Sequence, residues 1–391
     1  MLDEMEVLAM NNYFNEPIFV TRPLLPNLEQ VNRKMSEVWV SKWVTNNGLQ
    51  QKRLEEELKD YLEVDNLALF ANGTLALLLG LKSLNLSGEI ITTPFTFPAT
   101  VQALDWNGLT PVFCDIEPKT FTIDADKIEA LITEKTSAIL GVHVFGNPCE
   151  VEKIQEIADK HGLKVIYDGA HAFGMKINGA PVSSYGDMTM FSFHATKLFN
   201  TIEGGGLSFK DKGLAKTLGL LKNFGIGNSD EVVLSGLNAK MNEIQAAIGL
   251  ETLKLVTAER EKRHTIKKTY EKYLGNIPGI RILTSLENES SSYQYFVIEI
   301  DESLYGKSRD WLQEELEQYN VFTRKYFYPL CSDFTWYKHI ESAQSKSLPQ
   351  AQKTVREALA MPYYGDLELA SVESICDIVK FSRVTTASAA I

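Results

Sequence analysis

Short apolar runs alternate with helical patterns along the first half of the chain. The runs are rich in aromatic and β-branched residues, as is typical of buried strands. Strands are predicted at Ala68–Phe70, at the start of Gly88–Thr100, and at Thr110–Ile116, Ser137–Phe145, Leu163–Tyr167 and Met188–Phe193. Helices are predicted between them at Leu75–Leu84, Asp124–Ile132 and Val151–His161. This order of elements predicts an α/β fold with a mainly parallel sheet sandwiched by helices.

Further helical patterns precede and follow this region. They cover Asn27–Trp39, Gln50–Leu62, Met241–Lys254 and Ala258–Leu274. The last of these is rich in Lys and Glu, as expected of a helix that links two domains. Strands at Ile280–Leu283, Tyr293–Ile300 and Val321–Arg324 and a helix at Ser308–Gln318 come after it. We therefore expect a large domain over residues 1–255 and a smaller α/β domain over residues 256–391, with a frayed TTASAAI end.

The stretch Gly186–Gly206 ends its predicted strand in a polar cluster that contains Ser192 and Lys197. A lysine amine in apolar surroundings loses solvation, which lowers its pKa from about 10.4. Such an amine is a nucleophile that can form an imine with a carbonyl. The alternative is that Lys197 extends from the strand end into solvent.

A second candidate site is the predicted helix start Asn72-Gly73-Thr74. Asn72 can cap the helix, and Gly73 has no side chain to keep an anion away. Because the first backbone N–H groups of a helix have no partner within it, they form a ready phosphate site. The alternative is that the three residues merely cap the helix.

Three more candidates follow predicted strands. Phe97 stands where ligands bind in parallel α/β sheets, so its ring could cover a flat cofactor. Asp168 closes a strand, and a buried carboxylate there needs a partner such as a protonated ring nitrogen. His171 can donate a hydrogen bond to a phenolate-type oxygen. The alternatives are a core phenylalanine, an aspartate that caps a turn and a half-buried imidazole with its partners satisfied.

Together these candidates are what a pyridoxal phosphate site needs. Lys197 would supply the covalent amine, and Asp168 would keep the pyridine nitrogen protonated, so that the ring acts as an electron sink. The helix start and the Ser192 hydroxyl would hold the phosphate.

The composition argues against several other classes of protein. The net charge is −12 and the basic residues are dispersed, unlike those of nucleic-acid-binding proteins. The four cysteines have neither metal-ligand nor disulfide-framework spacing. The acidic N-terminus lacks the basic region of a signal peptide, and no apolar run reaches membrane-spanning length. We expect a cytoplasmic protein that has reduced cysteines and binds neither nucleic acid nor membrane.

Six segments of the chain resemble the motifs of one known family, in that family's order. They are Asn72–Leu77, Ile91–Thr100, Val142–Pro148, Val165–Gly174, Phe191–Gly206 and Gly236–Leu250. Through them the chain is similar to the DegT/DnrJ/EryC1/StrS sugar aminotransferases. The resemblance implies the aspartate aminotransferase-like fold, PLP fold type I, and pyridoxal 5'-phosphate as the cofactor.

The resemblance also implies a role for each candidate residue. Lys197 would be the catalytic residue that carries the cofactor, Asp168 would pair with its ring nitrogen, and His171 would contact its ring oxygen. The other implied cofactor contacts are Gly73, Thr74, Phe97, Ser192 and Asn238. Asn238 corresponds to an asparagine that reaches the phosphate from a neighbouring subunit, which implies a homodimer with shared active sites.

Three segments resemble one branch of the family, the transaminases that form dTDP-4-amino-4,6-dideoxy-D-glucose. They are Thr45–Gly48, Asn238–Met241 and Arg324–Leu330. The branch implies amino transfer from L-glutamate to C4 of dTDP-4-keto-6-deoxy-D-glucose, for surface polysaccharide (O-antigen) biosynthesis. The alternatives are a C3-selective or galacto-selective sugar aminotransferase, a PLP-dependent deoxysugar dehydratase and a non-catalytic regulatory protein. Lys197 argues against the dehydratase, which has His there, and the complete site argues against the regulatory protein.

Overall fold

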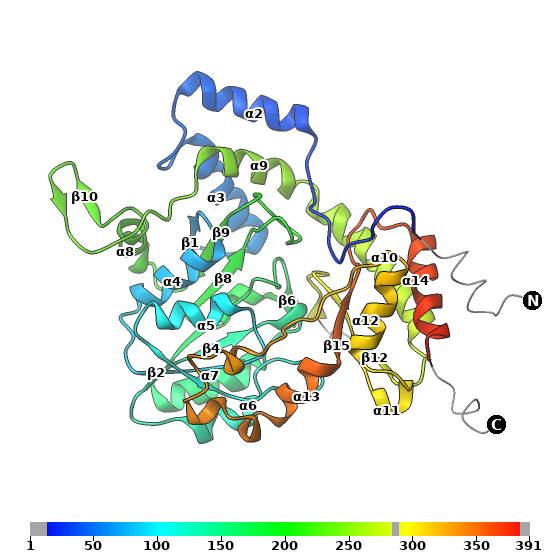
Figure 1. Ribbon diagram of the computed structural model, residues 1–391. Helices are drawn as coiled ribbons and strands as arrows, with labels where there is room; N and C mark the ends of the chain where they lie inside the picture. Colours follow the sequence, from blue (N-terminus) through cyan, green and yellow to red (C-terminus); the bar gives the residue numbers. More distant parts are fainter. Residues whose placement is uncertain (1–13, 284–288, 384–391) are drawn as a thin grey trace, which may run out of the picture.

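The computed structural model describes residues 14–283 and 289–383, so the TTASAAI end and the N-terminal acidic segment lie outside the described part. A seven-stranded sheet forms its centre, in the order β1-β9-β8-β5-β4-β2-β3 (Figure 1). The strands are β1 (Leu67–Phe70), β2 (Glu89–Thr92), β3 (Thr110–Phe113), β4 (Thr136–Val142), β5 (Lys164–Asp168), β8 (Met188–Ser192) and β9 (Gly205–Phe209). Only β9 runs antiparallel to its neighbours in this sheet.

Helices cover both faces of the large sheet. One face packs on α3 (Leu49–Leu62), α6 (Ala125–Ile128), α7 (Val151–His161) and α9 (Glu243–Leu253), and the other on α4 (Gly73–Ser83), α5 (Pro98–Asp105) and α8 (Leu214–Leu221). Within β4, Ile139 belongs to the first core and Ala138 and Leu140 to the second. Successive strand residues point to opposite faces, so a strand covered on both sides must be apolar throughout. The apolar runs predicted this arrangement.

A second sheet, in the order β12-β14-β15, is antiparallel and lies in the C-terminal part of the chain. It consists of β12 (Ile280–Ile282), β14 (Phe296–Ile300) and β15 (Ala358–Met361), and it shares a core with α10 (Val256–Leu274), α12 (Arg309–Gln318) and α14 (Leu369–Phe381). Another core joins the two sheets, since it contains Phe95 and Phe113 from one side and Tyr295 and Val297 from the other. The predicted domain boundary at residue 255 stays a prediction.

The remaining elements are short or peripheral. They are α2 (Leu28–Ser41), β6 (Lys176–Ile177), β7 (Ala180–Pro181), β10 (Ile226–Asn228), β11 (Glu231–Val232), β13 (Glu289–Ser290), α11 (Glu302–Tyr305) and α13 (Pro349–Glu357). Figure 1 shows α2 lying along the outside of α9 and the β10–β11 hairpin projecting from the body. None of the described helices is long and apolar enough to cross a membrane.

Three sequence predictions need correction. The helix predicted at Asp124–Ile132 is one α-helical turn followed by a 3-10 turn, because only Ala125 and Ile128 within it are buried. The strand predicted at Ser137–Phe145 ends at Val142, since the chain then turns with Phe145 at a φ of 57°. The strand predicted at Val321–Arg324 makes only isolated bridges, to Ile18 at one end and Ala360 at the other.

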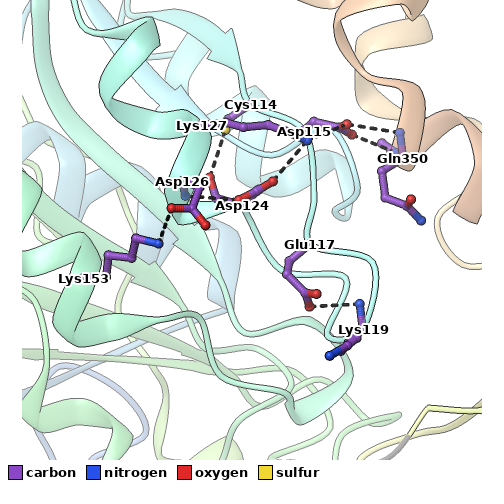
Figure 2. Close-up of polar contacts among 10 residues, drawn as sticks. Cys114, Asp115, Glu117, Lys119, Asp124, Asp126, Lys127, Lys153 and Gln350 are labelled. Atoms are coloured by element: carbon purple, nitrogen blue, oxygen red, sulfur yellow. Dashed lines mark hydrogen bonds and ion pairs between the residues drawn. The ribbon is translucent and has the colours of Figure 1, made fainter.

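A buried aspartate just after β3 ties the C-terminal part to the large sheet. Asp115 accepts hydrogen bonds from the backbone N–H groups of Gln350 (3.1 Å) and Ala351 (2.8 Å), which lie in the first turn of α13. Lys127 of α6 lies 3.2 Å from the same carboxylate (Figure 2). Asp115 therefore caps α13 across more than two hundred residues of sequence, where a negative charge also suits the helix dipole.

We expect Asp115→Ala to destabilise the fold by about 1–3 kcal/mol, because the N–H groups at the start of α13 and the Lys127 ammonium lose their buried partner. The midpoint of urea unfolding, followed by circular dichroism, should fall accordingly. Asp126→Ala is the matched control, since Asp126 pairs with Lys153 at the surface and its side chain is 78% exposed. Equal midpoints for the two variants would contradict this role of Asp115.

Candidate active site

A cavity of about 710 Å³ opens where the carboxyl ends of β1, β2, β4, β5 and β8 meet. Parallel α/β sheets bind their ligands at this edge. Seven of the eight predicted site residues line it: Gly73, Thr74, Phe97, Asp168, His171, Ser192 and Lys197. Asn238 is not among the lining residues. The structure thus brings together residues that are more than a hundred positions apart in the sequence.

The start of α4 forms one end of the cavity. Asn72 caps the helix by accepting a hydrogen bond from the Leu75 N–H group at 2.9 Å, as predicted. A Cβ on Gly205 would lie 2.6 Å from the Gly73 nitrogen, so the first residue of β9 must be glycine for the two backbones to pass. Ser192 borders the same turn, because a Cβ on Gly73 would lie 3.0 Å from the Ser192 Cβ atom. A helix N-terminus beside a hydroxyl can bind a phosphate.

Asp168 ends β5 with its carboxylate buried at the cavity wall. One oxygen accepts a hydrogen bond from the Thr100 hydroxyl at 2.7 Å, and the other accepts one from the Ala170 N–H group at 3.0 Å. Burial raises the pKa of Asp168 above its ordinary value, while the two hydrogen bonds and the charge of Lys197 act against this rise. The buried carboxylate is thus well suited to face a cationic ring nitrogen.

His171 is buried among aromatic rings at the same wall. Its ring lies parallel to those of Phe145 and Phe327, at 6.0 and 5.9 Å between centroids. Its Nδ1 atom accepts a hydrogen bond from the Phe145 N–H group at 3.2 Å, so the proton of the neutral ring is on Nε2. Burial lowers the pKa of His171 well below its ordinary value. The cavity therefore has a neutral imidazole with a free donor, suitable for a phenolate-type oxygen.

Lys197 lies in the loop after β8, and the C-terminal part of the chain holds this loop in place. The side chain of the buried Gln294 accepts a hydrogen bond from the Leu198 N–H group at 2.7 Å and donates one to the Thr196 carbonyl at 2.9 Å. The Lys197 Nζ atom lies 5.7 Å from the centre of the Tyr295 ring. Burial lowers the pKa of the amine to about 8, against the opposing charge of Asp168.

Phe97 borders the cavity as the residue before α5, and about half of its side chain is exposed. Phe95, the other aromatic residue of this segment, is fully buried and packs edge-on against Phe121 and Phe327. Of these two rings, only that of Phe97 borders the cavity and can cover a ligand there.

Asn238 lies in the exposed segment that follows the β10–β11 hairpin. Its side-chain oxygen accepts a hydrogen bond from the Lys240 ammonium at 2.7 Å. The β10–β11 hairpin and the segments that flank it carry exposed apolar side chains: Phe224, Val232, Val233 and Leu237, each 43–67% exposed. An apolar surface of this kind is typical of a protein–protein contact.

The sequence analysis missed two residues that support the cavity without lining it. Thr100 and Gln294 act on Asp168 and on the Lys197 loop through contacts between distant segments, and no local pattern marks them. Arg324 and Tyr326 do line the cavity and belong to Arg324–Leu330, the segment that resembles one branch of the family, and the Arg324 guanidinium lies 4.7 Å from the centre of the Tyr326 ring.

Solved structures with the same architecture cover nearly the whole chain. A crystal structure of DesI in the presence of its TDP-sugar product superposes with a TM-score of 0.90 at 33% identity, over 95% of this chain and 94% of that one. PseC of Helicobacter pylori, an aminotransferase involved in the biosynthesis of pseudoaminic acid, has a TM-score of 0.88 at 29% identity, over 94% and 99% of the two chains. The predicted aspartate aminotransferase-like fold is confirmed.

Curated relatives are similar over a comparable length. The dTDP-4-amino-4,6-dideoxy-D-glucose transaminase of Escherichia coli is 44% identical over 356 residues, which is 90% of this chain and 95% of the relative. The enzyme of the same name from Shigella dysenteriae is 40% identical over 93% of this chain and 99% of its own length. Since residues 27–380 also match the family as a whole, the chain belongs to the DegT/DnrJ/EryC1/StrS aminotransferase family.

Proposed function

We propose that this protein is a pyridoxal phosphate-dependent aminotransferase that transfers an amino group from L-glutamate to C4 of dTDP-4-keto-6-deoxy-D-glucose. The observation that carries the proposal is that Lys197, Asp168 and His171 line one cavity. The relatives at 44% and 40% identity support the choice of sugar, because both are named for the C4-amino product. We further propose a cytoplasmic enzyme of surface polysaccharide biosynthesis, and the four unpaired buried cysteines fit that compartment.

The residues of the cavity fit the proposed cofactor in chemistry and position. Gly73, Thr74 and Ser192 would hold its phosphate at the start of α4, and the exposed face of Phe97 would cover its ring. Asp168 would face the ring nitrogen, and the Nε2 proton of His171 would bind the ring oxygen. When bound, pyridoxal phosphate supplies an electron sink that stabilises negative charge at the carbon being deprotonated.

Lys197 has the properties that its two proposed tasks require. With a pKa of about 8, roughly one amine in ten is uncharged at pH 7, compared with roughly one in 3,000 at the ordinary value of 10.5. The neutral amine can attack a carbonyl, and once released it can carry a proton between neighbouring atoms of the substrate. The hydrogen bonds of Gln294 to Thr196 and Leu198, the two neighbours of Lys197, hold the backbone of this loop so that the amine stays at the cavity.

The acceptor and the donor are both anionic, and Arg324 is the guanidinium among the described residues that line the cavity. Arg324 is exposed, and its guanidinium lies 4.7 Å from the centre of the Tyr326 ring. We propose that it attracts the carboxylates of L-glutamate and the diphosphate of the sugar nucleotide in turn. In a protein of net charge −12, such a local cation is needed to draw anions to the site.

We also propose a homodimer in which Asn238 completes the neighbouring active site. Asn238 is exposed and lies outside the cavity of its own chain, and the β10–β11 hairpin and its flanking segments carry exposed apolar side chains. Family resemblance and this surface support the proposal jointly.

The reaction itself is tested by incubating the protein with pyridoxal phosphate, L-glutamate and dTDP-4-keto-6-deoxy-D-glucose and analysing the product by NMR. We expect an equatorial amino group at C4, recognised by the large diaxial couplings of the C4 proton, together with 2-oxoglutarate. An amine at C3, or an axial amine at C4, would contradict the proposed sugar specificity. Formation of 2-oxoglutarate without any aminated sugar would reject the substrate class.

We expect Lys197→Ala to lose the visible absorption band of the lysine-bound cofactor and to lose turnover by at least about a thousandfold, because no other amine takes over both tasks. Absorption spectra and initial rates measure the two effects. Lys210→Ala is the control, since Lys210 is an exposed lysine that does not line the cavity. Turnover in the Lys197 variant at the level of this control would remove Lys197 from the mechanism.

Shared active sites make a distinct prediction for mixtures of two variants. In Asn238→Asp, a second negative charge near the phosphate should weaken activity strongly. Exchange of subunits between Lys197→Ala and Asn238→Asp proteins then creates heterodimers with one intact site, and random exchange should restore about a quarter of the wild-type rate. A monomeric mass in light scattering, or no recovery after mixing, would contradict the shared site.

A further inference from the structure

Asp168 stands at the end of a chain of two buried threonine hydroxyls. The Thr100 Oγ1 atom lies 2.7 Å from Oδ2 of Asp168, and the Thr96 Oγ1 atom lies 2.7 Å from that of Thr100. The exposed fractions of Thr96, Thr100 and Asp168 are 1%, 0% and 4%, so no bulk water competes for these bonds. Thr100 belongs to the first turn of α5, whereas Asp168 ends β5. The contact therefore depends on tertiary structure.

The number of protons fixes the direction of this chain. A hydroxyl has one proton to donate, and an ionised carboxylate can only accept. While Asp168 is ionised, Thr100 must donate to it, and Thr96 must therefore donate to Thr100. If Asp168 takes up a proton on this oxygen and donates it to Thr100, the bond between them reverses and the Thr100 proton loses its carboxylate acceptor. The pair of hydroxyls is thus arranged to favour the charged carboxylate.

We infer that Thr100 is a positioning residue that keeps the Asp168 carboxylate ionised and directed into the cavity, with Thr96 orienting the Thr100 hydroxyl. This inference rests on the proposed function, in which the charge of Asp168 keeps the cofactor ring nitrogen protonated. It assigns a task to a buried side chain that does not itself touch the cofactor. A merely structural role, in which Thr100 only fastens α5 to β5, is the competing explanation.

Besides the hydrogen bonds, the charge of one neighbouring side chain acts on the pKa of Asp168. Lys197, in the loop after β8, is the charged side chain that lowers the pKa of Asp168. His143 follows β4 and His171 follows β5, and burial lowers the pKa of His143 to about 3 and that of His171 well below its ordinary value. Burial also raises the pKa of Tyr295 well above its ordinary value. These three groups stay neutral near pH 7, so the hydrogen bonds to Asp168 and the charge of Lys197 are what counteracts burial, which still leaves the pKa of Asp168 above its ordinary value.

The test compares Thr100→Val, which keeps the shape and removes the hydroxyl, with Thr100→Ser, which keeps the hydroxyl. Thr252→Val is the matched control, because Thr252 is fully buried and donates to a backbone carbonyl in α9, away from the cavity. The protonation of Asp168 is followed in the cofactor-free protein by infrared difference titration, with Asp168→Asn identifying its carboxyl band. The visible spectrum and the pH profile of kcat are then measured with pyridoxal phosphate bound.

We expect Thr100→Val to raise the midpoint of the Asp168 titration by about one pH unit, a tenfold change in its ionisation equilibrium. The sign follows because loss of a donor to the charged form favours the protonated form, so activity is lost at a higher pH on acidification. The acid limb of kcat should move in the same direction, and the visible spectrum should change toward that of Asp168→Asn. Thr100→Ser and Thr252→Val should both stay close to wild type.

Equal titration midpoints in Thr100→Val and wild type would overturn the inference, and so would a Thr100→Ser variant that behaves like Thr100→Val. If Thr100→Val does not fold, Thr100→Cys, with a weakly donating thiol of similar size, should show a smaller rise, and no rise there would equally overturn it. A wild-type protein without a visible band in pyridoxal phosphate would reject the proposed function instead. The infrared titration would still decide the role of Thr100.

Discussion

The site depends on the removal of water from two groups of opposite charge. Burial favours the neutral form of both Asp168 and Lys197, raising the pKa of the acid and lowering that of the amine to about 8. Each of the two charges partly counteracts this effect on the other. The result is an amine that is often uncharged near neutral pH, beside a buried acid whose charged form accepts two hydrogen bonds. A wetter cavity would give an ordinary lysine and an ordinary aspartate.

The fold supplies this environment by bringing strand ends to one edge. Asp168 ends β5, Ser192 ends β8, and Phe97 and the start of α4 follow β2 and β1. The backbones at this edge are closely packed. A Cβ atom on Gly205, for example, would collide with the backbone of Gly73. The walls are completed from the C-terminal part of the chain by Tyr295, Arg324 and Phe327. The cavity is therefore a property of both sheets together.

The sequence predicted what depends on local pattern. Apolar runs predicted the central strands, and Asn27, Asn72 and Ser308 each cap a helix that the sequence predicted. Family motifs predicted seven of the residues that line the cavity, because each motif is a continuous run of sequence. The same reasoning was wrong for Val321–Arg324, whose apolar start bridges Ile18 and Ala360 without forming a strand ladder. It also missed Thr100 and Gln294, whose partners lie 68 and 96 residues away. Contacts over such separations leave no periodicity in a single sequence.

The two hydrogen bonds between Gln294 and the Lys197 loop have a consequence for the synthesis of the chain on the ribosome. During translation, Leu198 leaves the ribosome with its loop lacking that partner, and 96 further residues must be added before Gln294 exists. The capping of α13 by Asp115 waits still longer, since its partner Ala351 lies 236 residues downstream. Early strands of the nascent polypeptide can collapse, but the lysine loop gains its hydrogen bonds to Gln294 only after that residue has been added. The Lys197 loop therefore depends on the C-terminal part of the chain for its final position.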